Sequence, residues 1–146
     1  MSSLLLVCHV SPEIGIGHLS RLLALAETLR KDNNVIPEFL IFGDFIKKKE
    51  LANFNVHAFS LTDDLVSTIE NILEMNNFGA LIFDLYPKHN IDNLDELFIQ
   101  LKRRNICLIS IDSLIEYCNI LDLVWIPSFN FDCNKYTNCT SVLKSG

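Results

Sequence analysis

Short apolar segments alternate with longer, helix-forming segments along most of this chain. Six segments have the length and apolar character of strands, at residues 4–10, 35–42, 55–60, 78–83, 106–111 and 121–126. Four segments between them are predicted as helices, at residues 22–31, 44–53, 65–75 and 91–104. This alternation predicts a mostly parallel sheet with right-handed crossovers. We therefore expect an α/β fold with a sheet of about six strands.

The turn after the first predicted strand carries the densest set of candidate functional residues. The strand at 4–10 is almost continuously apolar, as expected for a strand buried on both faces. Gly15 and Gly17 follow it and allow the backbone to turn tightly beside a ligand. The helix then begins near His18, where unpaired N–H groups and the positive end of the helix dipole favour a phosphate or carboxylate. Open α/β sheets bind ligands at this edge, at the carboxyl ends of their strands.

His18 and Arg21 lie three residues apart in the first turn of this helix. His18 can exchange a proton near neutral pH, and Arg21 can hold a phosphate through two parallel hydrogen bonds. Alternatively, His18 caps the helix, and Arg21 is solvated or forms an ion pair that packs the helix. A dinucleotide-binding or flavodoxin-like domain is disfavoured, because the third glycine of the dinucleotide fingerprint is absent and position 20 is Ser.

Two further candidates follow the fourth predicted strand and so lie at the same edge of the sheet. Asp84 can accept a hydrogen bond from a ligand hydroxyl or orient His18, and its alternative role is a turn cap. Tyr86 can line the same site, and its alternative role is ordinary packing. Asp44, after the second strand, occupies the region where a dinucleotide fold holds ribose, but a helix N-cap is the simpler role.

Composition narrows the possible functions. The chain has 146 residues, 49% of them hydrophobic, which is enough for one domain with a substantial core. Its formal net charge of −6 disfavours nucleic acid as a partner, because no basic surface offsets the acidic excess. No apolar run approaches the roughly 18 residues of a membrane span, and residues 1–3 lack the basic n-region that is typical of a signal peptide. We therefore expect a cytoplasmic protein.

The five cysteines are odd in number and include no CxxC pair, which favours a reducing compartment. Cys8 and Cys107 fall in predicted buried strands, where thiols behave as small hydrophobes. Cys133, Cys139 and the scattered histidines lack the spacing of a zinc site. We expect no metal and no cofactor.

Several of these segments together resemble one enzyme family. Residues 14–21 and 25–29 resemble the first loop and helix of the UDP-sugar hydrolases of pseudaminic acid biosynthesis, which act on UDP-2,4-diacetamido-2,4,6-trideoxy-altropyranose and are related to GT-B glycosyltransferases. Residues 81–86 resemble that family's strand ending in Asp-x-Tyr, and residues 109–112 and 118–124 resemble its next two strands. The resemblance implies a Rossmann-like three-layer sandwich, the amino-terminal half of a GT-B fold.

The resemblance also implies a function, in surface polysaccharide or nonulosonic acid biosynthesis. His18 would be the general base that activates water, or the hydroxyl of a sugar acceptor, for attack at the anomeric carbon of a UDP-sugar, with release of UDP. The residues that would bind this substrate are Gly15, Gly17, Leu19, Arg21, Asp84 and Tyr86.

The predicted Rossmann-like domain spans residues 1–127, and residues 128–146 are expected to be an irregular tail or the start of a linker. In the resembled family a second domain of similar size follows and makes most contacts to the uridine diphosphate. This chain stops about where that domain would begin. The alternative is therefore a non-catalytic or truncated half that acts only with a separately encoded partner.

Overall fold

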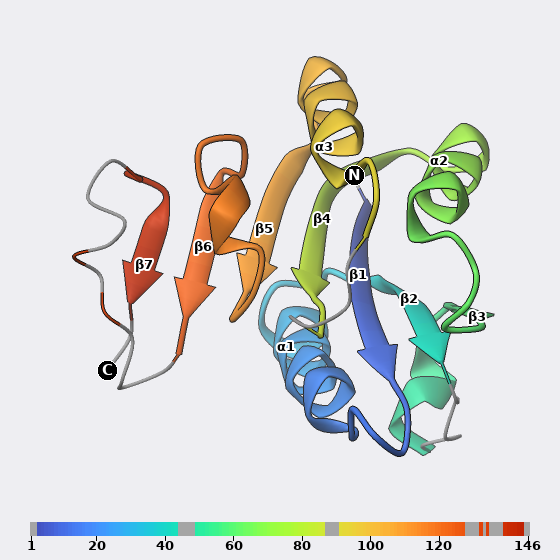
Figure 1. Cartoon of the computed structure of the whole chain (residues 1–146). Coiled ribbons are helices and arrows are strands. Elements are labelled where there is room, and N and C mark those ends of the chain that lie inside the picture. The colour runs from blue at the N-terminus through green and yellow to red at the C-terminus, as the bar shows by residue number, and fades with distance from the viewer. Residues whose placement is uncertain are drawn as a thin grey trace.

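The computed structural model describes residues 3–43, 49–86, 91–127, 132, 134 and 139–144. Within these residues seven strands form one sheet in the order β3-β2-β1-β4-β5-β6-β7 (Figure 1), and every neighbouring pair is parallel. The strands are β1 (Ser3–Val10), β2 (Glu38–Gly43), β3 (Val56–Phe59), β4 (Phe78–Asp84), β5 (Cys107–Ile111), β6 (Leu123–Ile126) and β7 (Val142–Lys144). The helices are α1 (Gly17–Asp32), α2 (Leu65–Met75) and α3 (Leu94–Arg103), with 3₁₀ turns η1 (Lys49–Asn53) and η2 (Ile115–Tyr117).

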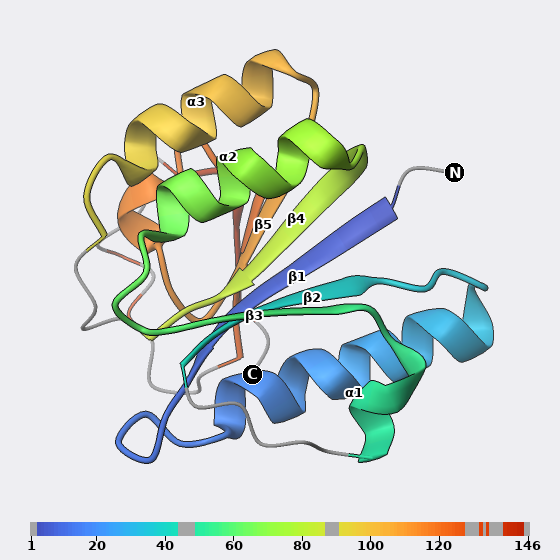
Figure 2. The same ribbon diagram turned by 90° about the vertical axis from the view of Figure 1, so that its right-hand side faces the viewer.

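Helices cover both faces of the sheet, so the fold is the expected Rossmann-like three-layer α/β sandwich. Helix α1 packs on one face, and α2 and α3 pack on the other (Figure 2). Alternate residues of β1 enter the two cores: Leu5 and Val7 pack on the side of α2 and α3, whereas Leu6 and Cys8 pack on the side of α1. The almost unbroken apolar sequence of β1 is explained by burial on both sides.

The central position of β1 creates the point where the strand order reverses. The chain runs from β1 outward to β2 and β3, then crosses over to β4 on the other side of β1. The segments that leave the carboxyl ends of β1 and β4 therefore diverge. Open α/β sheets bind their ligands in the crevice at this switch point.

The ends of the elements agree with local sequence signals. Helix α2 begins after Asp64, whose carboxylate accepts hydrogen bonds from the backbone N–H groups of Val66 and Ser67. Strand β6 begins at Leu123, because the preceding Asp122 turns its carboxylate toward the backbone N–H of Leu108 on β5, 2.8 Å away.

The segment expected to be an irregular tail contributes a strand. Residues Val142–Lys144 form β7, and Val142 pairs with Val124 of β6. The expectation of irregular structure is therefore wrong for these three residues, and the sheet has one strand more than the sequence indicated.

The cysteines depart from expectation at two points. Cys107 is exposed, although it lies at the start of the predicted buried strand that the structure shows as β5. A disulfide joins Cys118 to Cys139, which a reducing compartment would disfavour. Cys133 lies outside the described residues, and so does Asp44, the expected cap of a helix whose described part is the 3₁₀ turn η1.

No helix in the described part of the chain is both long enough and apolar enough to cross a membrane.

Candidate functional site

The side chains of His18 and Arg21 converge on one buried carboxylate. Asp84 ends β4 and is completely buried. His18 Nδ1 lies 2.6 Å from its Oδ1 atom. Arg21 donates from Nε to Oδ2 at 2.6 Å and from Nη2 to Oδ1 at 2.7 Å, the two-pronged geometry that guanidinium and carboxylate groups favour.

The alternation of side chains along β4 and the helical repeat of α1 bring these three residues together. On β4, Ile82 and Asp84 face α1, whereas Leu81 and Phe83 face α2 and α3. His18 and Arg21 lie one turn apart on α1, which begins directly after the loop that follows β1. The neighbouring strands β1 and β4 thus place His18 and Arg21, which follow β1, beside Asp84, which ends β4, at the switch point. The sequence predicted this edge correctly, and the structure selects the ion pair among the roles considered for Arg21.

The negative charge of Asp84 influences its neighbours. Its hydrogen bond with Arg21 raises the pKa of that guanidinium, although partial burial acts in the opposite direction. Burial, and secondarily the charge of Asp84, raise the pKa of the Cys8 thiol well above its ordinary value. Cys8 therefore remains a protonated thiol at neutral pH and is not a nucleophile.

The hydrogen bonding of His18 determines which of its nitrogen atoms is available for chemistry. The carboxylate of Asp84 accepts, so Nδ1 of His18 carries the proton in this pair. In the neutral ring Nε2 is then the basic atom. The His18 side chain is 16% exposed, so the ring is not sealed in the core.

Asp112, which the sequence analysis did not select, lies on the other side of Arg21. It follows β5, and its Oδ2 is 3.5 Å from Arg21 Nη1. Its backbone is left-handed, with φ of 59°, and its N–H donates to the carbonyl oxygen of Trp125. The available signal was the one that identified Asp84, an aspartate at the carboxyl end of an apolar strand.

The loop between β1 and α1 closes on itself. Gly15, with φ of 82°, donates its N–H to the carbonyl oxygen of Ser11 at 2.7 Å. Gly17 is the first residue of α1, and no side chain caps this terminus. The side chain of Leu19 is completely buried in the core under α1, so only its backbone can serve a ligand.

Tyr86 is tied to the opposite face of the sheet. Its backbone N–H donates to Nδ1 of His9 at 3.2 Å. His9 is 2% exposed, packs edge-on against Phe42, and lies one residue from Cys8 but on the side of α2 and α3. His9 was not predicted from the sequence, although a polar residue near the end of an otherwise apolar strand was a usable signal.

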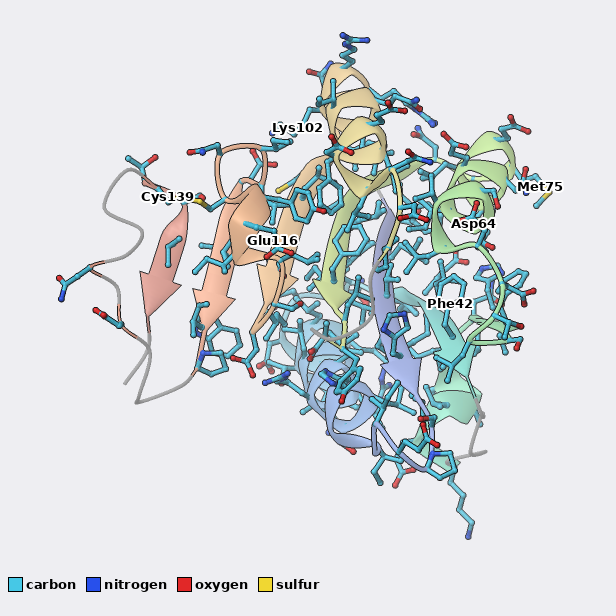
Figure 3. All side chains as sticks on the ribbon, viewed as in Figure 1. Phe42, Asp64, Met75, Lys102, Glu116 and Cys139 are labelled. Atoms are coloured by element: carbon cyan, nitrogen blue, oxygen red, sulfur yellow. A yellow bond between two sulfur atoms is a disulfide. The ribbon has the colours of Figure 1, made fainter. Side chains whose placement is uncertain are left out.

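Two cavities open at the same carboxyl edge, toward β2 and β3. One, of about 610 Å³, is lined by Gly43, Ala58, Phe59, Ser60, Leu61 and Asp63. The other, of about 430 Å³, lies between the ends of β1 and β2 and the starts of α2 and α3, and its lining includes His9, Phe42, Asp64 and Asp92. Figure 3 shows Phe42 and Asp64 on this side of the sheet. His18 lies on the α1 side, away from both linings.

Among the residues that the structure describes, no three His, Cys, Asp or Glu side chains gather in the manner of a metal site.

Comparisons with known proteins give little further information. The sequence matches no model of a protein family, and it matches no curated protein. Among solved structures, the chain is similar to a homoserine dehydrogenase from S. aureus with a TM-score of 0.48 and 10% identity. That alignment covers 84% of this chain and 29% of the dehydrogenase, so this chain spans under a third of it.

Proposed function

We propose that this chain is the His18-bearing domain of a nucleotide-sugar hydrolase or glycosyltransferase of surface polysaccharide or nonulosonic acid biosynthesis. The observation that carries the proposal is the His18–Asp84 pair at the switch point of the sheet. The resemblance of residues 14–21 to the UDP-sugar hydrolases supports a UDP-sugar as the substrate class.

In this proposal His18 acts as a general base. Nε2 accepts a proton from water, or from an acceptor hydroxyl, as the oxygen attacks the anomeric carbon and the bond to UDP breaks. Asp84 holds the ring in the required tautomer and stabilises the imidazolium that forms. General-base catalysis contributes about 10²–10⁴ in rate.

The departing diphosphate also needs hydrogen-bond donors. The uncapped amino terminus of α1 offers backbone N–H groups beside His18, in the arrangement that binds phosphates at other helix starts. Arg21 is a poorer donor than its charge suggests, because Asp84 engages two of its nitrogen atoms and Asp112 approaches the third.

Because two carboxylates already engage Arg21, the second candidate function is favoured, a half-site that acts together with a separate partner. A partner that supplies further cations to the diphosphate would complete the leaving-group site. In this case the present chain contributes the base, and UDP release depends on both components.

An amide NMR titration of the chain with UDP and UDP-N-acetylglucosamine tests the binding claim. We expect shifts at Gly15 to Arg21 and at Asp84 to Tyr86. The absence of shifts at millimolar ligand would contradict binding by this chain alone.

A UDP-release assay then tests catalysis, with a candidate second domain added if the chain alone is inactive. We expect His18→Ala to lower turnover about 10²–10⁴-fold while the UDP-induced shifts persist. His57→Ala is the matched control, because His57 pairs with Glu38 on β2, away from the switch point. Equal turnover of the His18 variant and the wild type would refute the role of His18 as base.

A further inference from the structure

The two carboxylates that flank Arg21 hold it with very different strength. Asp84 is fully buried and takes the Nε–Nη2 side of the guanidinium at 2.6 and 2.7 Å. Asp112 faces the Nη1 end at 3.5 Å, and its side chain is 42% exposed. The first contact is a tight, two-pronged pair, whereas the second lies at the outer limit of a hydrogen bond.

We propose that Asp112 controls anion binding at this site by competing with a phosphate group of the ligand for Nη1 of Arg21. This inference rests on the proposed function, and it adds a residue that tunes the affinity for the diphosphate. Asp84 fixes the guanidinium in place, so only the Nη1 end is open to exchange of partners.

Breaking the contact between Asp112 and Arg21 costs little free energy. Its carboxylate is already partly in water, and a loose exposed ion pair contributes little. Its backbone is anchored independently by the hydrogen bond to Trp125, so the loop need not move when the pair opens. A phosphate oxygen at Nη1 would form a shorter, charge-assisted bond in its place.

The charge balance shows what Asp112 does in the absence of ligand. Arg21 carries one positive charge and faces two carboxylates, so this trio carries a net negative charge that repels an approaching anion. A ligand without phosphate escapes that repulsion. Asp112 thus lowers the affinity for phosphate-bearing ligands selectively.

The test compares UDP with uridine, which lacks the phosphates, by amide NMR titration of the wild type and two variants. Asp112→Asn and Asp112→Gly both remove the carboxylate, and both residue types accept the left-handed backbone at this position. Glu74→Gln is the matched control, because it removes the same charge from the exposed last turn of α2, at the opposite edge of the sheet.

We expect both Asp112 variants to bind UDP about threefold to tenfold more tightly than the wild type. We expect the affinity for uridine to be unchanged, the control to match the wild type, and the UDP difference to shrink in high salt. If all four proteins bind UDP equally, the role of Asp112 is refuted while UDP binding stands. If none binds UDP, the claim that this chain alone binds the diphosphate fails, and this inference fails with it. Equal tightening for UDP and uridine would also refute competition at Arg21.

Discussion

Replacing Asp84 with alanine tests how the constellation at the switch point is held together. Asp84 is the common acceptor for His18 and for two nitrogen atoms of Arg21, and it is completely buried. Asp84→Ala leaves a guanidinium without its main partner. His18→Ala removes one donor but leaves the Arg21–Asp84 pair intact. The two changes disrupt the same cluster, yet their costs in stability should differ strongly.

The expected losses of folding free energy follow from how deeply each broken contact is buried. Removing one partner of a buried ion pair costs about 3–5 kcal/mol, and the 29% exposure of Arg21 places Asp84→Ala near 3 kcal/mol, since water solvates part of the guanidinium. For His18→Ala, the lost hydrogen bond to a charged acceptor is partly offset by the higher helix propensity of alanine, leaving about 1 kcal/mol. Asp112→Asn breaks only a loose exposed pair and should cost less than about 0.5 kcal/mol.

Thermal and urea unfolding of the three variants measure this order. At about 2–4 °C per kcal/mol for a chain of this size, we expect Asp84→Ala to lower Tm by roughly 6–12 °C and His18→Ala by roughly 3 °C. An Asp84 variant within about 1 kcal/mol of the wild type would refute the reasoning, as would a greater loss for the His18 variant.

Three other measurements test separate parts of the structure. Gly43→Ala should destabilise the fold by more than about 3 kcal/mol in urea unfolding, because a Cβ there would lie 1.7 Å from a backbone oxygen of β1, whereas Gly17→Ala meets nothing within 4 Å and should be tolerated. Although burial opposes it, hydrogen bonds from Lys102 of α3 and from the backbone of Leu108 on β5 lower the pKa of Asp122 below its ordinary 3.8. Asp122→Asn should therefore destabilise the fold at pH 7 by less than about 1 kcal/mol, because water screens a side chain that is 37% exposed. This difference is present above pH 3.8 and should disappear as pH falls through the lowered value, which unfolding curves from pH 7 to pH 2 would show. Iodoacetamide followed by peptide mass mapping should label the exposed Cys107 in the native protein and the buried Cys8 only after unfolding. The rate for Cys107 should rise with pH because the thiolate is the reactive form, and partial burial, which raises the pKa of this thiol, should move that rise to higher pH than for a free cysteine.

The sequence predicted the layered fold because its strands and helices carry local signals. Local sequence alone specifies the apolar run of β1, the glycines at the start of α1 and the capping aspartate of α2. Strand β7 lacks such a signal. Its three residues form a strand because they pair with β6, and that pairing depends on tertiary structure that no short window of sequence contains.

The candidate site was predicted in position but not in its internal bonding. Residues that follow parallel strands meet at one edge, which sufficed to select His18, Arg21 and Asp84. Which groups bond there depends on side-chain direction. The alternation along β4 directs Asp84 toward α1, whereas Tyr86 bonds through its backbone to His9 on the other face. Asp112 carries the same sequence signal as Asp84, but its contact with Arg21 depends on tertiary structure.

The central place of β1 also has a consequence for biosynthesis. β1 is synthesised before the other strands of the sheet, yet its residue Cys8 pairs with Asp84, so one of its two edges has no partner until β4 has been synthesised. At a translation rate of roughly 5–20 residues per second, one edge of this apolar strand stays unpaired for several seconds. Pairings so distant in sequence also slow folding itself. The unpaired edge of β1 exposes the nascent chain to aggregation during that interval. The bond between His18 and Asp84 has to wait as well, because the helix that carries His18 is made well before the strand that carries Asp84.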